Sequence, residues 1–482
     1  MISCGITRHL MLCLLSVVLS SFINGINQSV RESSFESIFR FTNRVIHYRI
    51  LEEKQMSNPG KDLEKIYKLD DHSEERLKDF KTLWSTSYLI SIITGAIIGG
   101  YMADKVGRKK GLIWSNIFIF IAAFFTSFSY RFGSYEMIII GQILVGANIG
   151  INSCLAPIYL SEVSPIRLRG IFSSVYVLGT GLALVISQSV ITIFKLENWV
   201  YMFSSVIIPS ILMLFIINEC PESPKFSFIL RGDHTKGQTA LQKLRENSEV
   251  NDELYEMKVE YQLIQRSQRL EFQTFLNDYK LRNALLISMT VSMSQHLTGI
   301  TSVPSFAKSV YKDLSLSERS QSYISIALLT ISFKISLIFA ILVERLGRRT
   351  LLLMGLLGVF CALIFLSFCI ALRESLDVLN HLNIITLFVY IILYSCGPSF
   401  IPNFYFVELF RTDCRSIGAT ISVVTLYIVP LIISISFISF ETNLESYVAA
   451  VFAVLTLILW IIIYKTVPET KGKTIEEIIY EL

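Results

Sequence analysis

The sequence predicts an all-α membrane protein with twelve transmembrane helices in two pseudo-symmetric halves of six. Three observations support this prediction. The 482 residues are 52% apolar and only 17% charged, whereas a soluble domain carries about 25% charged residues. Twelve apolar windows are each long enough to cross a bilayer core of about 30 Å. Charged signatures also recur in the same order in both halves, which indicates a duplicated chain.

The spans fall into two groups of six on either side of a polar stretch. The windows cover residues 10–28, 83–103, 111–130, 136–160, 171–194 and 198–218, and then 283–308, 322–343, 350–372, 383–409, 416–438 and 446–466. We therefore expect an N-terminal half at 1–218 with an outer loop at about 30–81, a helical linker at 219–281, a C-terminal half at 282–466 and a short tail at 467–482. The first window also fits a cleaved signal peptide, but cleavage would leave an odd half, so we keep it as a helix.

The basic residues of the short loops predict the orientation. Lys and Arg gather at 104–110, 161–170, 344–349 and 411–415, and these loops share one side of the membrane if both termini are cytoplasmic. The linker joins that side as amphipathic helices, and the outer loop faces outside. Asn27-Gln28-Ser29 is a glycosylation sequence that lies too deep in the first helix for ready modification. We expect a multi-pass protein of the plasma membrane.

Composition and motifs disfavour several classes of function. A net charge of +4 is too small and scattered for a nucleic-acid-binding protein. The eight cysteines lie mostly in apolar segments, so we expect no disulfide framework outside and no metal site. The sequence contains no phosphate-binding loop and suggests no nucleophile–base arrangement, so we expect neither a cofactor nor an enzyme. The expected partners are a small solute and the lipid bilayer, and a monomer should suffice for function.

The paired signatures carry a family resemblance. Asp104-Lys105-Val106-Gly107-Arg108-Lys109 recurs as Glu344-Arg345-Leu346-Gly347-Arg348-Arg349, Glu162 and Arg169 recur as Glu408 and Arg415, and Pro221-Glu222-Ser223-Pro224 recurs as Pro468-Glu469-Thr470-Lys471. With Gln295-x-x-x-Gly299 and Gly397-Pro398, this set resembles the sugar porter family of the major facilitator superfamily, specifically its facilitative hexose transporters. The resemblance implies the major facilitator fold and transport by alternating access.

Charged residues at the ends of the helices are expected to form a cytoplasmic gate. The candidates are Asp104, Arg108, Glu162, Arg169, Glu344, Arg348, Glu408 and Arg415. Removing one partner of a buried ion pair strands the other charge, so pairs that bridge the halves would hold this side closed. In the family such a network forms in the outward-open state and breaks as the protein opens inward. For Lys109, Lys110 and Arg349 the positive-inside rule explains the charge equally well.

Polar residues inside apolar windows predict the substrate path. The substrate-binding candidates are Gln295, His296, Thr298, Thr301, Asn403, Lys334 and Asn27. Gly299 and Pro304 interrupt the seventh window, as is typical of a broken helix at a binding site. Amides and hydroxyls suit a neutral sugar, and an aromatic face can stack on its ring. Tyr159, Tyr405 and Tyr427 are candidates for such walls, although tyrosines more often only pack.

The candidate site departs from the hexose site of the family. The departures are His296 for the second glutamine of the seventh-helix motif, Thr301 for an asparagine, Val177 for a glutamine, Asn403 for a tryptophan, Leu426 for an asparagine and Ser395 for a glutamate. Each lost hydrogen bond is worth about 0.5–1.5 kcal/mol net. A different polyol, a weakly bound hexose or a non-sugar therefore remains open beside glucose.

Lys334 is a cation midway along the eighth span. It lies ten residues from Glu344, or about 15 Å along a helix. A buried ammonium is costly, so we expect it either to face a water-filled cavity, where it would favour an anionic substrate, or to snorkel toward the membrane surface.

The spans contain few groups that titrate, which bears on energy coupling. Proton-coupled members of the family carry an acid in the first helix and an arginine in the fourth, where this chain has Asn27 and Gln142. We therefore expect a facilitative uniporter of a hexose or related small polyhydroxylated solute. An organic-anion carrier and a proton-coupled sugar symporter, with His296 as the titrating group, are the alternatives. A non-transporting nutrient sensor belongs to another class, and the short tail after Val467 disfavours it.

Overall fold

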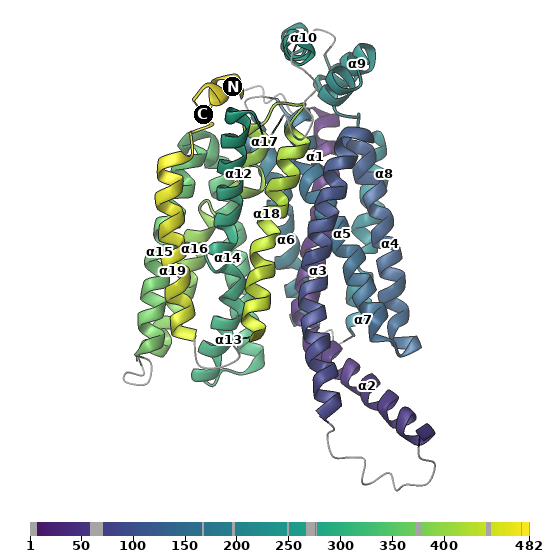
Figure 1. The fold of residues 1–482 in the computed structure, drawn as a ribbon, viewed down its shortest axis with the longest axis vertical. Coiled ribbons are helices and arrows are strands. Elements are labelled where there is room, and N and C mark those ends of the chain that lie inside the picture. Colours follow the sequence, from purple (N-terminus) through teal and green to yellow (C-terminus); the bar gives the residue numbers. More distant parts are fainter. Residues whose placement is uncertain are drawn as a thin grey trace.

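The computed structural model describes residues 7–57, 71–165, 168–194, 198–247, 250–266, 275, 277–372, 378–439, 445–473 and 475–481. Within these ranges the chain forms helices and no strand. Ten of the helices described are long and apolar enough to cross a membrane. Interrupted helices occupy the seventh and tenth positions, so the predicted architecture of two six-helix halves is confirmed (Figure 1).

The N-terminal half follows the predicted windows. Its helices are α1 (Arg8–Ser33), α3 (Asp71–Lys105), α4 (Arg108–Phe132), α5 (Tyr135–Val163), α6 (Arg169–Phe194) and a sixth span divided into α7 (Trp199–Ser204) and α8 (Ile207–Glu219). The Thr7 side chain caps α1 by accepting a hydrogen bond from the Leu10 amide. The division of the sixth span at Ser205 and Val206 was not predicted.

The C-terminal half repeats this order with two more interruptions. Its elements are α12 (Tyr279–Leu297), the 3₁₀ turn η4 (Ile300–Ser302), α13 (Val303–Asp313), α14 (Glu318–Leu346), α15 (Arg348–Ala371), α16 (Val378–Ser395), the 3₁₀ turn η5 (Ile401–Asn403), α17 (Tyr405–Leu409), α18 (Arg415–Ser439), α19 (Glu445–Thr466) and the short α20 (Ile475–Glu481). Gly299, with a φ of +84°, ends α12, so the predicted break in the seventh span is confirmed.

The break in the tenth span was not predicted, because its window reads as continuously apolar. The residues between α16 and α17 include Pro398 and Pro402, which lack the backbone N–H that a helix needs. The break is also packed in place. A Cβ on Gly397 would lie 2.5 Å from the Leu351 carbonyl oxygen, and a Cβ on Gly355 would lie 2.3 Å from Pro398.

The linker between the halves lies at one end of the bundle (Figure 1). It contains the π-helical turn η3 (Phe226–Leu230), α9 (His234–Arg245) and α10 (Asn251–Arg266). The start of α1 and the short α20 lie at the same end. We call this the linker end of the bundle and the opposite end the far end.

The far end contains helices within the stretch expected as an outer loop at about 30–81. The α1 helix continues to Ser33, α2 (Phe35–Ser57) follows at once, and α3 begins at Asp71. Apolar side chains at helical spacing explain α2, because Ile38 and Phe41 are buried on one side of it. The Phe41 ring lies 5.5 Å from the Trp199 ring, centroid to centroid, so α2 packs on the N-terminal half.

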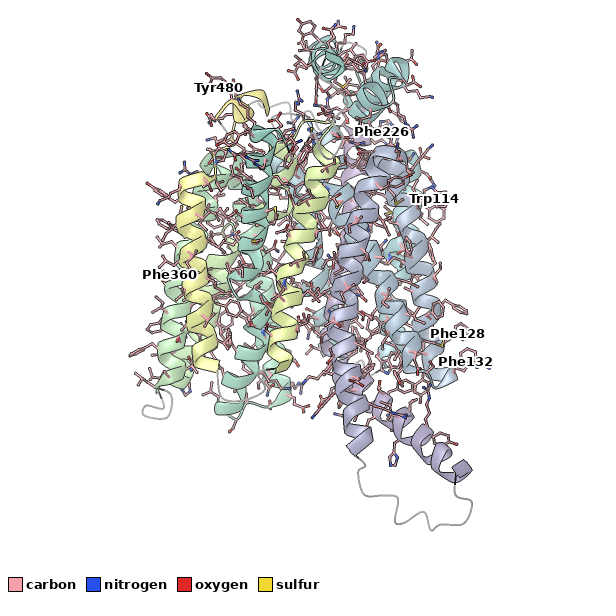
Figure 2. The ribbon with its side chains drawn as sticks, viewed as in Figure 1. Trp114, Phe128, Phe132, Phe226, Phe360 and Tyr480 are labelled. Carbon is pink, nitrogen blue, oxygen red and sulfur yellow. The ribbon has the colours of Figure 1, made fainter. Side chains whose placement is uncertain are left out.

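Aromatic side chains cover the outside of the bundle, as expected for a surface that faces lipid. Trp114, Phe128 and Phe132 project from one edge of α4 (Figure 2). Trp114 is 57% exposed and Phe132 is 66% exposed. Such apolar exposure is unfavourable in water and suits a hydrocarbon solvent.

Glycines let helices of the N-terminal half approach closely. A Cβ on Gly150 of α5 would lie 2.1 Å from the Ile92 carbonyl oxygen of α3, and one on Gly146 would lie 1.9 Å from Ser91 Oγ. A Cβ on Gly179 would lie 2.0 Å from Ser21 Oγ of α1. Only a residue without a side chain permits these close helix contacts. Gly181 differs, because a Cβ there would make only an ordinary contact of 3.6 Å.

Candidate functional site

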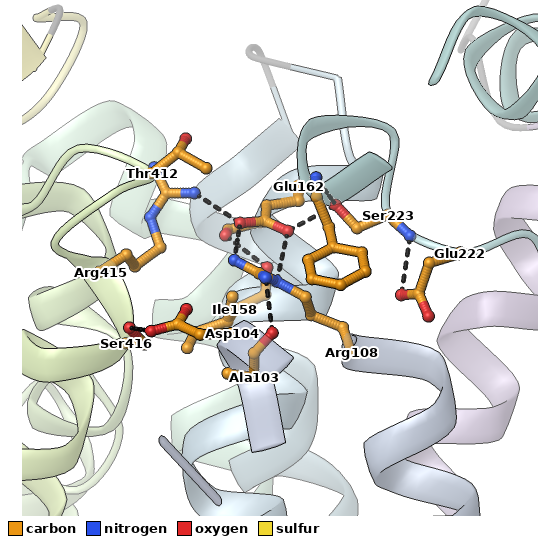
Figure 3. Close-up of polar contacts among 12 residues, drawn as sticks. Ala103, Asp104, Arg108, Ile158, Glu162, Glu222, Ser223, Thr412, Arg415 and Ser416 are labelled. Carbon is orange, nitrogen blue, oxygen red and sulfur yellow. Dashed lines mark hydrogen bonds and ion pairs between the residues drawn. The ribbon is translucent and has the colours of Figure 1, made fainter. Parts of the chain in front are cut away.

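Glu162 is the centre of a polar network at the linker end (Figure 3). Its carboxylate accepts hydrogen bonds from Arg108 Nη2 at 3.1 Å and from Ser223 Oγ at 2.5 Å. Arg108 Nη1 donates to the Ala103 carbonyl oxygen at 2.8 Å. The side chains of Arg108 and Glu162 are fully buried. A buried carboxylate with this many donors is held in one geometry.

The C-terminal half builds the same arrangement from the second copy of each signature. Glu408 accepts from Arg348 Nη2 at 2.9 Å and from Thr470 Oγ1 at 2.5 Å. Arg348 also donates to Glu344 through Nη1 at 2.9 Å and Nη2 at 3.0 Å. The repeated sequence signatures thus form the same contacts in each half, a glutamate bonded to an arginine and to a hydroxyl.

The glutamate of the last signature in each half, Glu222 or Glu469, packs against the glycine of the first signature, Gly107 or Gly347. Glu222 Oε1 accepts from the Lys109 amide at 2.9 Å, and Glu469 Oε1 accepts from the Arg348 amide at 2.9 Å. The turns before these amides contain Gly107 and Gly347, with φ of +106° and +90°. A Cβ on Gly107 would lie 2.7 Å from Glu222 Oε2, and one on Gly347 would lie 2.4 Å from Glu469 Oε2. Only glycine fits both the backbone and the space.

Hydrogen bonds at the linker end also join the two halves. Arg415 Nη1 of α18 donates to Glu162 Oε1 of α5 at 2.9 Å, and both side chains are almost fully buried. Ser416 Oγ of α18 donates to Asp104 Oδ2 of α3. The Gly170 amide of α6 donates to Glu344 Oε1 of α14 at 2.8 Å. These bonds connect helices that carry the predicted gate residues, and they hold the halves together at this end.

The linker helix α10 adds a further connection. Glu260 Oε2 accepts from Lys225 Nζ at 2.7 Å, and Glu260 Oε1 accepts from Thr412 Oγ1 at 2.6 Å. Burial by itself would raise the pKa of Glu260, but the charges of Lys225 and Arg415 outweigh it and lower the pKa from its ordinary 4.5 to about 2. Glu260 therefore stays ionised at neutral pH and ties the linker to the C-terminal half.

Arg169 departs from the prediction that it pairs with a carboxylate. No carboxylate of the described chain lies within ion-pair distance of it, and its Nε is buried without a hydrogen-bond partner there. The network is therefore asymmetric. Arg415 reaches across to Glu162, whereas Glu344 is already occupied by Arg348 and by the Gly170 amide.

Sequence reasoning missed several members of this network. Tyr159 donates to the Pro221 carbonyl oxygen at 2.7 Å, and Tyr405 donates to the Pro468 carbonyl oxygen at 2.8 Å. These tyrosines therefore belong to the linker end and not to aromatic walls of a binding site. The signal was available, because both precede the paired glutamates by three residues. The hydroxyls of Ser223 and Thr470 also hold equivalent places in the repeat.

A second polar cluster lies farther from the linker end, between the halves. Asn403 Nδ2 of η5 donates to Gln295 Oε1 of α12 at 2.8 Å, so two predicted binding residues meet. The His296 ring lies 6.4 Å from the Tyr427 ring of α18, centroid to centroid. The Tyr427 side chain also packs against the apolar cluster that contains Tyr88 of α3. Helices of both halves thus contribute to one cluster.

Buried amides and an imidazole in this cluster retain hydrogen-bonding capacity. Both amide atoms of Asn27 and Nδ1 of His296 are buried without a partner in the described part of the chain. Such groups cost free energy unless a ligand or water satisfies them.

Thr298 and Thr301 are less suited to the predicted role. Thr298 is fully buried, its Oγ1 donates to the Gln295 carbonyl oxygen at 2.6 Å, and its own carbonyl accepts from Tyr390 at 3.0 Å. Its hydroxyl is therefore used within the broken helix. Thr301 is exposed in η4, beyond the end of α12.

Lys334 does not face the polar cluster. It is exposed on α14 at helical spacing from Leu337, Ile338 and Ile341, which are 40%, 50% and 56% exposed. The other side of α14 carries Ser336, which donates to the Ser395 carbonyl oxygen. Residues two apart point to nearly opposite sides of a helix. Lys334 therefore lies on the outer stripe of α14, the exposed apolar side formed by Leu337, Ile338 and Ile341. Of the two alternatives left open for Lys334, this position fits snorkelling toward the membrane surface rather than a water-filled cavity.

Asn27 and Gln142, the two positions linked to proton coupling, are both buried amides. Gln142 is buried, and neither of its amide atoms has a partner within the described ranges. One acid was overlooked, because α1 extends to Ser33 and so includes Glu32. Glu32 is exposed near the end of α1 and accepts from Gln28 Nε2 at 3.5 Å.

Comparisons with known proteins agree with this geometry. The sequence profile of the family described as "Sugar (and other) transporter" matches residues 17–482. Solute carrier family 2, facilitated glucose transporter member 1 of Gallus gallus is 30% identical over 410 residues, which are 83% of this chain and 82% of that protein. Facilitated glucose transporter protein 1 of Caenorhabditis elegans is 29% identical over 415 residues, with 82% and 79% covered.

Solved structures share the fold. The major facilitator superfamily proton:xylose symporter XylE bound to 6-bromo-6-deoxy-D-glucose superposes with a TM-score of 0.79 at 20% identity, covering 98% of this chain and 97% of that chain. The inward-open conformation of the E. coli xylose transporter XylE gives a TM-score of 0.69 at 19% identity, covering 97% and 99%. The two-half bundle is therefore the major facilitator fold.

Proposed function

This chain belongs to the family of sugar (and other) transporters, and from that premise we propose that it is a facilitative carrier of a hexose or related small polyhydroxylated solute. Its relatives include facilitated glucose transporters. The proposed mechanism is alternating access, in which the two halves rock about a central site.

The observation that carries the proposal is the set of bonds between the halves at the linker end. Glu162 is fixed within its own half by Arg108 and bonded across the interface by Arg415. A bond across the interface contributes only while the linker end is closed, so it favours the state open at the far end. Opening the linker end breaks it and leaves the intra-half bonds intact. A bond that forms in one state and breaks in the other is what a gate requires, whereas ordinary packing is the same in both states.

The polar cluster between the halves supplies the proposed solute site. Gln295 and Asn403 present amides that satisfy each other in this structure and can exchange that bond for sugar hydroxyls. Asn27 and His296 have unused capacity. Tyr427 and Tyr88 offer aromatic faces beside them. We assign these side chains, and not Lys334 or Thr298, to the solute.

Uniport is the proposed mode of energy coupling. A proton-coupled carrier needs a group in the transport path that gains and loses a proton during the cycle, and amides occupy the positions of Asn27 and Gln142. His296 is the residue through which proton symport would act. A carrier assignment also places the chain outside the enzymes, as its relatives suggest. Loss of flux with retained binding would identify the sensor alternative.

The proposed orientation places the linker end in the cytoplasm. The basic loops around Lys110, Arg345 and Arg411 lie at this end, as the positive-inside rule expects. Both termini are then cytoplasmic and α2 is extracellular. The plasma membrane is the proposed location, and a monomer contains every residue assigned to the gate and the solute site.

Uptake into proteoliposomes tests the function. The purified chain is reconstituted, and radiolabelled hexoses, pentoses and polyols are supplied outside with and without a preset pH gradient. We expect saturable uptake of at least one polyhydroxylated solute that stops at equal concentrations inside and outside. Accumulation driven by the pH gradient would overturn uniport, and binding without uptake of any solute would overturn the carrier assignment.

A further inference from the structure

Lys334 is a cation in the middle of α14, one of the helices long and apolar enough to cross a membrane. The nearest charged residues along α14 are Arg319, fifteen residues before it, and Glu344, ten residues after it. These intervals are about 22 Å and about 15 Å along a helix, which is more than the four-carbon stem of a lysine can reach. Snorkelling therefore brings the ammonium only part of the way to the membrane surface. An ammonium left at this depth is costly unless a group of opposite charge pairs with it.

The described part of the chain offers Lys334 no such group. No described carboxylate lies within ion-pair distance of it. The two flanks of α14 are already packed, because Ser332 Oγ lies 2.8 Å from Ser395 Oγ of α16, and a Cβ on Gly181 of α6 would lie 3.6 Å from the Phe333 ring. Lys334 is exposed on the outer stripe, away from both contacts, so a partner would have to come from outside the described chain.

The side of α14 that carries Lys334 suits the close approach of another helix. Ala327 and Thr330 precede Lys334 by seven and four residues and so lie on the same side of α14. Both side chains are small, and small residues let the backbone of a second transmembrane helix come near. A long side chain leans toward the N-terminus of its own helix. Ala327 and Thr330 therefore leave room for the ammonium and for a group that pairs with it.

We propose that the outer stripe of α14 binds a transmembrane helix of a partner membrane protein, and that Lys334 pairs there with an Asp or Glu in the middle of that helix. A second copy of this chain cannot supply the carboxylate, because none of the twelve apolar windows holds an Asp or Glu away from its ends. The partner is therefore a different membrane protein. Leu337, Ile338 and Ile341 would pack against apolar side chains of the same helix, closer to the linker end.

Synthetic transmembrane peptides test the inference, because they present a single charged group at a chosen depth. The probes are leucine-rich helices of about 22 residues that carry Glu, Gln or Lys at the centre, and a fourth that carries Glu near one end. The purified full-length chain is reconstituted with each peptide in phosphatidylcholine vesicles, and energy transfer between fluorophores on the two molecules measures their association. The variants are Lys334→Gln, Lys334→Glu and, as the control, Lys465→Gln, which removes an exposed lysine from the last turn of α19.

We expect the wild type to associate at least about fivefold more strongly with the central-Glu peptide than with the central-Gln peptide. Lys334→Gln should lose this preference, Lys465→Gln should retain it, and Lys334→Glu should instead prefer the central-Lys peptide. Equal association of the wild type with the central-Glu and central-Gln peptides, or an unchanged preference in Lys334→Gln, would overturn the inference. An equal gain from Glu near the peptide end would also overturn it, since the ammonium would then lie at the membrane surface.

Discussion

Replacement of Arg415 by alanine tests the gate directly, because it removes a hydrogen bond that joins the two halves. Arg415 Nη1 donates to Glu162 Oε1 at 2.9 Å, and the two side chains are 3% and 0% exposed. The substitution leaves Glu162 paired with Arg108 and Ser223. No buried charge is stranded on the N-terminal half, so the chain should still fold and reach the membrane.

The magnitude follows from the one bond that is lost. A hydrogen bond between charged groups contributes about 1.5–3 kcal/mol, and each 1.4 kcal/mol is about a factor of ten in an equilibrium constant. The ratio of linker-closed to linker-open molecules should therefore fall by about 10- to 150-fold. Net uptake should slow, because the empty carrier must return to the far-end-open state before it can bind again.

The assay combines initial uptake rates in proteoliposomes with hydrogen exchange of α17 and α18. We expect slower uptake for Arg415→Ala and faster exchange at the start of α18. Arg169→Ala is the matched control, because Arg169 is the repeat counterpart of Arg415 and forms no ion pair with described residues; its effect should be several-fold smaller. Uptake at the wild-type rate from equal amounts of Arg415→Ala protein would refute the gating role.

Three further predictions concern the linker, the solute site and the packing. The carboxylate of Glu260, with its pKa lowered from 4.5 to about 2, stabilises the linker contact above about pH 4.5 and loses that contribution only as the pH falls toward 2; hydrogen exchange of α10 should thus be faster in Glu260→Gln at pH 7, and after correction for the intrinsic rate it should not change from pH 8 to pH 5. Asn403→Ala removes the bond to Gln295, and loss of one solute hydrogen bond should raise KM by about 2- to 10-fold; an unchanged KM would exclude Asn403 from the site. Gly150→Ala should lower Tm, because its Cβ would lie 2.1 Å from a backbone oxygen, whereas Gly181→Ala should not; equal Tm values would contradict the packing role.

Hydropathy and repetition were enough to predict the fold. An apolar window in a bilayer has one stable backbone solution, the helix, because no water is available to pair its amides. The duplicated signatures then predicted two halves and the identity of the charged residues at the linker end. The break in the seventh span was predicted from Gly299 and Pro304. The break in the tenth span was missed although Pro398 and Pro402 mark it, because its hydropathy window stays apolar across both prolines.

The residues of the candidate site were harder to predict from the sequence, because the sequence does not specify how each helix is rotated about its axis. A helix shows its composition in the sequence but not which side faces the partner half. For Lys334 the sequence left open a water-filled cavity or the membrane surface, and the residue lies on the outer side of α14 beside Leu337 and Ile338.

The sequence by itself thus determined the membrane fold, the duplication and most of the charged residues that gather at the linker end, because these follow from local hydropathy and from repeated motifs. Tertiary structure alone decided which charges meet across the halves. Glu162 and Arg415 are separated by 253 residues, and no local rule connects them. Their repeat counterparts, Glu408 and Arg169, do not pair with each other. Glu408 is hydrogen-bonded within its own half by Arg348 and Thr470, and Arg169 has no carboxylate within ion-pair distance in the described chain. Pairing across an interface depends on how two surfaces meet, and only the packed bundle specifies that.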